Sequence, residues 1–218
     1  MKTKKIILFI LMFLPLIVTF IALQFLPEQV PAHYDFNNQI TRWGSKYETL
    51  ILPACNVFFG FFMLGMAKYS AKQEENGKNN ENVCMIAGIV SLLLFNAMTG
   101  YSLYADFNHV ENLSSIAVDL YQLIFGILGI SMVIIGNVMP KVRMNSIVGL
   151  RTSWSMKNET TWKKSQRFGG ISLIVGGIVM VAACILVKGF ACFLWAMGIF
   201  ATLSIIDICY MYKISKKY

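Results

Sequence analysis

The side chains in this chain that could perform chemistry are few, and most of them lie in two polar loops. The first loop reads LPEQVPAHYDFNNQITRWGSK and places His33 two residues before Asp35. Together with Asp106, His109 and Glu111 from a later polar segment, these side chains could contribute to a metal site. Their spacing matches no metal-binding signature, so the default interpretation is a set of exposed polar residues.

The cysteines and glycines indicate packing rather than chemistry. The five cysteines lie inside or beside apolar segments, without a Cys-x-x-Cys pair or a histidine at ligand spacing: Cys55, Cys84, Cys184, Cys192 and Cys209. Several glycines in apolar segments would let helices approach closely: Gly126, Gly129, Gly136, Gly176 and Gly177. No nucleophile with an activating base is visible, so the sequence indicates neither an enzyme nor a cofactor.

The segments that carry the loops are strongly apolar. Hydrophobic residues make up 56% of the 218 residues, charged residues only 14%, and the mean hydropathy is +0.60. A helix that crosses a bilayer needs about 20 mostly apolar residues. Six segments meet this requirement, near residues 6–26, 50–67, 83–104, 115–139, 168–187 and 189–212. We predict a single all-α integral membrane domain, residues 1–218, with about six transmembrane helices.

The first and last apolar segments need separate comment. The first follows MKTKK, as in a signal peptide, but it continues to Leu26 with no A-x-A pattern before Pro27, so we expect a retained helix. Little more than Lys188 and Gly189 separates the last two segments. The choice between five and six spans therefore stays open at this point.

The basic residues predict the orientation. With a cytoplasmic N-terminus, sixteen of the 19 Lys and Arg residues fall on the inside and only Arg42, Lys46 and Lys188 on the outside. Both termini are then cytoplasmic, residues 27–47 form an extracellular loop, and residues 140–167 form a cytoplasmic loop. The net charge of +8 lies beside an anionic lipid leaflet, and direct nucleic-acid binding is not expected.

The cytoplasmic loop is long and rich in basic and tryptophan residues. Pro140 should end the preceding helix, and Asn158 with Glu159 should begin the next one. Trp154 and Trp162 are then expected at the depth of the lipid headgroups. The loop's basic side chains would face lipid phosphates: Lys163, Lys164 and Arg167.

The residues of both loops resemble a known family. IVGLRTSWSMKNETTWKKSQRFGG resembles the C-terminal signature of the SdpI family of bacterial membrane proteins, which reads GLRTPWTL followed by an acidic-Thr-x-Trp element and a basic-Arg-x-Gly ending. The first loop is similar to the family's outer element, which begins LP, continues with xIPxH or a near variant, and closes on a small residue before Lys. Ser153 replaces the usual proline and Ser155-Met156 replaces Thr-Leu, which removes one backbone constraint.

The resemblance implies immunity against a secreted peptide toxin at the plasma membrane. It also implies a receptor that holds a transcriptional repressor, of ArsR type, at the membrane. The cytoplasmic signature, expected to bind the repressor, comprises Gly149, Leu150, Arg151, Thr152, Trp154, Glu159, Thr160, Trp162 and Arg167. The outer loop would face the toxin with Pro27, Pro31, His33, Asp35, Trp43 and Lys46.

A membrane sensor without immunity and a small exporter are the alternatives. A transporter should carry ionisable residues inside its spans, and only Asp119 and Asp207 qualify. Asp119 is expected about one turn inside the outer end of the fourth span. Asp207 is expected near the inner end of the sixth, where Lys213 or Arg167 could pair with it.

Overall fold

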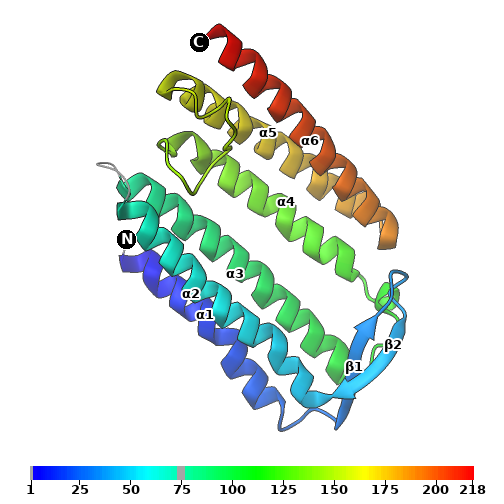
Figure 1. Ribbon diagram of the computed structural model, residues 1–218. Helices are drawn as coiled ribbons and strands as arrows, with labels where there is room; N and C mark the ends of the chain where they lie inside the picture. The colour runs from blue at the N-terminus through cyan, green and yellow to red at the C-terminus, as the bar shows by residue number, and fades with distance from the viewer. Residues whose placement is uncertain (1, 73–76) are drawn as a thin grey trace.

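Six long helices make up most of the computed structural model, which describes residues 2–72 and 77–218. Each helix is long and apolar enough to cross a membrane, so the predicted all-α integral membrane fold is confirmed. Figure 1 shows the helices side by side in a bundle. They are α1 (Lys2–Ala22), α2 (Ile51–Lys72), α3 (Gly77–Phe107), α4 (Leu120–Val138), α5 (Glu159–Leu186) and α6 (Gly189–Lys217).

The break between α5 and α6 settles the number of spans. Val187 and Lys188 both have extended backbone, and α6 begins directly afterwards at Gly189. The φ of Gly189 is +63°, in the left-handed region that favours glycine. Two residues and one glycine are therefore enough to reverse the chain, and the six-span interpretation is confirmed.

Two of the bundle's apolar cores are each shared by three consecutive helices. The first core joins α1, α2 and α3 through Leu8, Met12, Ala67, Cys84, Met85 and Leu92. The second joins α4, α5 and α6 through Phe125, Met132, Met180, Cys184, Cys192 and Ala196. Buried cysteines belong to both cores, as expected for small packing residues.

Glycine pairs bring the backbones of α4 and α5 together. A Cβ atom at Gly129 would lie 2.8 Å from the carbonyl oxygen of Gly177, and one at Gly136 would lie 2.6 Å from that of Gly170. Helices in membranes associate through such small residues because backbones can then touch. The sequence predicted this role for three of the four and missed Gly170, whereas the space around Gly126 is open.

The outer loop folds into a β-hairpin, the only sheet in the described residues. Strand β1 (Gln29–Tyr34) pairs antiparallel with β2 (Ile40–Ser45), and a 3-10 turn (Lys46–Leu50) leads into α2. Asn38 adopts φ 62° at the tip, a conformation that Asn tolerates. The hairpin is hydrogen-bonded to the second outer loop, since Ile40 N donates to Glu111 O at 2.8 Å.

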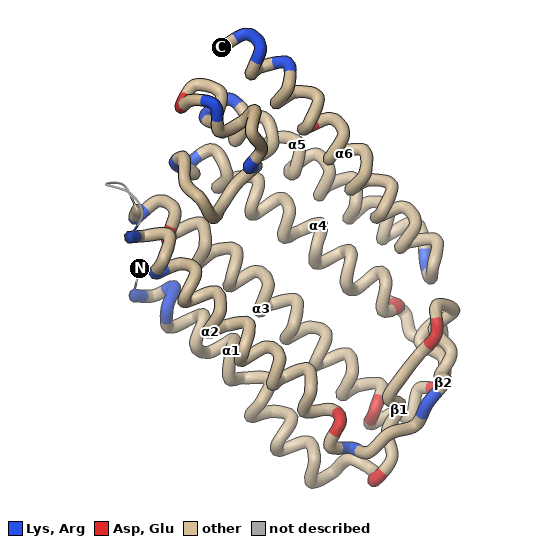
Figure 2. The backbone as a smooth tube through the Cα atoms, viewed as in Figure 1, with Lys and Arg blue, Asp and Glu red and all other residues tan. Residues whose placement is uncertain are grey.

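Charge is distributed unevenly between the two ends of the bundle. Both termini lie at one end and the hairpin lies at the other (Figure 1). Lys and Arg gather at the end that carries the termini, whereas acidic residues mark the hairpin end (Figure 2). A common end for the termini agrees with an even number of spans, and the cytoplasmic placement of that end stays a prediction from charge.

Candidate functional site

The outer hairpin exposes a few of the predicted side chains. His33 is exposed, its ring Nδ1 lies 2.6 Å from the Thr41 hydroxyl, and Trp43 is 40% exposed. Pro31 is buried, and Pro27 is half-buried at the corner between α1 and β1. Of the residues predicted to face a toxin, His33 and Trp43 therefore have the most accessible side chains.

Asp35 and Lys46 instead hold the shape of the hairpin. Asp35 Oδ1 accepts hydrogen bonds from Asn37 N at 2.8 Å and Gln39 N at 2.9 Å. Such a side-chain bond to the backbone two residues later closes a turn without a regular helix or strand. Lys46 Nζ pairs with Glu28 at 2.9 Å and joins the two ends of the loop.

Two polar contacts fix the base and the inner face of the hairpin. Arg42 contacts both carboxylate oxygens of Glu48 at 2.8 and 3.1 Å, and this hydrogen-bonded carboxylate raises the pKa of Arg42. The Tyr34 hydroxyl donates to Val110 O at 2.6 Å. Burial is the main cause that raises the pKa of Tyr34, with the negative charge of Asp106 as a further cause.

The tip of the hairpin reaches the second half of the bundle. Phe36 packs edge-to-face on Phe190 at the start of α6, with ring centroids 5.7 Å apart. The Tyr121 hydroxyl of α4 donates to Phe36 O at 3.1 Å. The hairpin therefore forms a cap across the outer end, from α1 and α2 to α4 and α6.

Asp119 is not inside a span, so its predicted position is wrong. It is the N-cap of α4, is 1% exposed, and accepts from Gln122 N at 2.9 Å. Its Oδ2 accepts from Gly189 N at 2.6 Å, and the Gln122 amide donates to Cys184 O at 2.7 Å. The carboxylate satisfies backbone donors at helix starts, which is a structural task.

The residues considered for a metal site are dispersed. Among the described residues, no group of three or more His, Cys, Asp or Glu side chains is placed to hold a metal ion. The His109 ring lies against Trp43, with centroids 6.2 Å apart. Asp106 is 1% exposed below the hairpin, whereas His33 is exposed.

The inner loop is ordered by its own polar side chains. The turn after α4 (Met139–Lys141) contains Pro140, and the Asn145 carboxamide accepts from Ile147 N and Val148 N, both at 2.7 Å. Asn158 caps α5, as predicted, through a hydrogen bond from Thr161 N at 2.9 Å. The loop thus has a defined conformation although it contains no long helix.

Gln166 is central to the inner loop, and the sequence did not single it out. Its side-chain amide pairs with the backbone of Leu150, accepting from N at 3.0 Å and donating to O at 2.9 Å. Gly149 has φ +108°, and a Cβ there would lie 2.5 Å from Gln166 Oε1. The buried residues Trp162, Gln166 and Gly169 recur at helical spacing, which is the pattern that would have revealed the contact.

Trp162 is a core residue, so its predicted place among the lipid headgroups is wrong. Its side chain is 1% exposed and packs with Val83, Val138 and Val142. The indole Nε1 donates to Val142 O at 2.9 Å. The loop folds back over the start of α5, and a buried indole with a satisfied N–H is the result.

The remaining signature residues are either exposed or in contact with α6. Four side chains are exposed: Arg151, Glu159, Thr160 and Arg167. Trp154 is half-buried and contacts Tyr212 of α6 edge-to-face, at 5.4 Å between centroids. The Thr152 hydroxyl contacts Ser155 and lies 3.5 Å from the Met211 sulfur. The inner loop therefore docks on the end of α6 and leaves a charged surface free.

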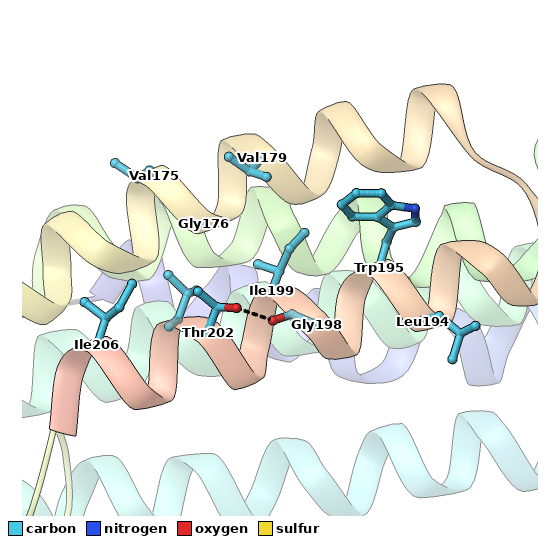
Figure 3. A pocket seen from close by; sticks show the side chains of 10 residues that line it. Val175, Gly176, Val179, Leu194, Trp195, Gly198, Ile199, Thr202 and Ile206 are labelled. Atoms are coloured by element: carbon cyan, nitrogen blue, oxygen red, sulfur yellow. Dashed lines mark hydrogen bonds between the residues drawn. The ribbon is translucent and has the colours of Figure 1, made fainter. Parts of the chain in front are cut away.

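Within the second half of the bundle, α6 carries a buried acidic group and an apolar groove lies between α5 and α6. Asp207 is 7% exposed, its Oδ1 has no hydrogen-bond partner in the described chain, and neither predicted ion pair, with Lys213 or Arg167, is formed. A cavity of about 580 Å³ lies between α5 and α6. Figure 3 shows its apolar lining, where the Thr202 hydroxyl is bonded to Gly198 O at 2.8 Å. No charged residue lines this groove.

Comparison with known proteins connects both loops to described families. The SdpI/YfhL protein family matches residues 141–211, and a domain of unknown function (DUF1648) matches residues 10–57. The chain is 27% identical over 180 residues to Immunity protein SdpI of Bacillus subtilis (strain 168), covering 81% of this chain and 79% of that protein. No solved structure matches. The predicted resemblance is confirmed, and the chain is a multi-pass protein of the bacterial cell membrane.

Proposed function

Because this chain shares the SdpI family signature, we propose that it is an immunity protein that protects the cell membrane against a secreted toxic peptide. The 27% identical relative carries the name Immunity protein. The observation that carries the proposal is the folded outer cap, which a peptide arriving from outside would meet first. Its shape is already fixed by the turn at Asp35 and by the Lys46–Glu28 ion pair at 2.9 Å. A preorganised surface binds without the free-energy cost of ordering a loop.

The inner surface supports a second part of the same proposal, the retention of an ArsR-type repressor. The exposed residues Arg151, Thr160 and Arg167 lie in or beside a loop whose backbone is held by Gln166 and Asn145. A rigid backbone with free charged side chains suits recognition of a protein partner. A sensor that retains the repressor without giving immunity is the alternative.

Immunity is tested by expressing the protein in a bacterium sensitive to the cognate toxin and recording the membrane potential. Cells with the wild-type protein should keep their potential, and replacement of residues 31–39 by Gly and Ser should abolish protection. Trp43→Ala is the finer variant, because this side chain is 40% exposed on the cap. Trp195→Ala is its matched control, since that side chain is 58% exposed on α6, away from the cap.

Retention of a repressor is tested with the inner surface. Arg151→Ala should release a tagged repressor from the membrane fraction while the amount of inserted protein is unchanged. Lys141→Ala is the control, because it also removes one exposed cation from the same end. Equal release in both variants would favour general charge attraction to the membrane over a specific surface.

Export of the toxin is a second candidate, favoured by Asp207. This carboxylate is 7% exposed within α6 and has an unpartnered oxygen. Ionisable groups inside spans often serve proton-coupled transport. Asp207→Asn should leave protection intact under the interception proposal. Loss of protection in Asp207→Asn together with tolerance of the hairpin replacement would make export the better account.

A further inference from the structure

Two adjoining cavities lie under the hairpin, at the outer ends of α2 and α3. Their volumes are about 280 and 200 Å³. Both are lined by the same five residues, which come from β1, α2 and α3: Pro31, Ala32, Leu52, Ser102 and Asp106. The shared wall makes them two lobes of one hollow, which we call the outer cavity.

Asp106 is the unsatisfied charge-bearing group of the outer cavity. It is 1% exposed, and its Oδ2 has no hydrogen-bond partner among the residues that the structure describes. Arg42, the cation among the lining residues, is already bound by Glu48 at 2.8 Å. Tyr34 donates its hydroxyl proton to Val110 O instead. A carboxylate buried without a counter-ion is costly, so this position favours an incoming cation.

The remaining lining indicates which cation would fit. The Tyr101 hydroxyl is also buried with no hydrogen-bond partner in the described part of the chain, and Ser102 adds a second hydroxyl. Between them the walls are apolar, formed by Leu52, Met98 and Leu113. Ca²⁺ or Mg²⁺ would take about six oxygen ligands, and the described residues hold no group of three or more His, Cys, Asp or Glu side chains for another metal ion. One unpaired carboxylate, with hydroxyls and hydrocarbon walls, suits an ammonium head on an aliphatic stem, since Glu48 in the same lining is already paired with Arg42.

We propose that the outer cavity binds a primary ammonium group on an aliphatic stem, with Asp106 as its counter-ion. In a peptide this chemistry occurs in a lysine side chain or a free amino terminus. This inference rests on the proposed function in one respect: it takes a peptide toxin as the molecule that supplies the ammonium group. It names the place below the cap where an intercepted toxin would be anchored.

Cys55 provides a reporter, because it lines the outer cavity and is exposed. Of the remaining four cysteines, only Cys209 is exposed, so a Cys209→Ser background leaves one accessible thiol. Modification of Cys55 by N-ethylmaleimide is followed by mass in the full-length protein in lipid nanodiscs. Hexylammonium is the probe, and hexanol and sodium chloride are the controls.

Hexylammonium should slow the modification of Cys55, whereas hexanol and sodium should not. In Asp106→Asn the protection should weaken by about tenfold or more, as is usual when one partner of a buried charge pair is removed. Glu111→Gln, which removes an exposed outer carboxylate instead, should behave as wild type. Protection by hexanol or sodium, or equal protection in Asp106→Asn, would overturn the proposal.

Two short peptides then distinguish the sources of the ammonium group. One has an acetylated amino terminus and a single lysine, and the other has a free amino terminus and no lysine. If either peptide slows the modification of Cys55, the proposal is supported, and the peptide that slows it more identifies the source of the ammonium group. If neither peptide slows it, the proposal that a peptide ammonium group binds in the outer cavity is overturned. Because no toxin is present, immunity can fail in cells while ammonium binding persists, and the two failures are distinguishable.

Discussion

Truncation of Trp162 should destabilise the protein strongly, although the residue belongs to a loop signature. Trp162→Ala removes a side chain that is 1% exposed among Val83, Val138 and Val142. Such a truncation costs about 3–5 kcal/mol. The indole bond to Val142 O at 2.9 Å is lost as well, and an orphaned buried carbonyl adds about 1–3 kcal/mol.

Together the two losses of about 4–8 kcal/mol correspond to a fall in Tm of roughly 10–30 °C for a domain of this size. The assay heats the purified protein in detergent and measures the fraction that stays monodisperse. Trp195→Ala is the matched control, because this indole is 58% exposed and should melt close to wild type. Trp162→Phe keeps most of the apolar bulk and should lose about 1–3 kcal/mol, through the hydrogen bond alone. If Trp162→Ala and Trp195→Ala melt together, the burial of Trp162 is refuted.

Three further predictions test topology and packing. A reporter active only in the cytoplasm should give signal when fused after Lys157 and none when fused after Asn37; the reverse would invert the bundle. Gly136→Ala should lower the Tm by several degrees, because its Cβ would lie 2.6 Å from a backbone oxygen, whereas Gly126→Ala should not. Asp119→Asn should lower the Tm too, since its Oδ2 accepts from a backbone N–H at 2.6 Å; an unchanged melting curve would contradict the capping role.

The helices could be predicted from the sequence because a span has a simple requirement, a long apolar run. The start of α5 at Asn158 was predicted too, because capping depends on neighbouring residues only. The two paired strands of the hairpin were not predicted from the sequence. Its strands are six residues each, and their pairing depends on a turn closed by Asp35 and Asn38.

Burial at the two ends could not be predicted, because it depends on contacts distant in the chain. From the sequence alone, a tryptophan beside lysines is as compatible with a position among the lipid headgroups as with a buried one. The fold of the inner loop onto Val83 and Val142 is what buries Trp162. Asp119 lies at the edge of an apolar run, and its partner Gly189 is 70 positions away. Asp106 was considered as a metal ligand, but the sequence does not show the cavity around it.

The glycine pairs of α4 and α5 also have a mechanical consequence. Two glycine pairs seven residues apart bring the two backbones into contact from the middle of α4 to its last turn, which leaves little room for the helices to slide past each other. At one end of this helix pair, Asp119 accepts a hydrogen bond from Gly189 N beneath the hairpin tip. At the other end, the inner loop is held by its hydrogen bonds to Gln166. Displacement of the hairpin cap is therefore expected to tilt α4 and α5 together, without sliding of one helix past the other.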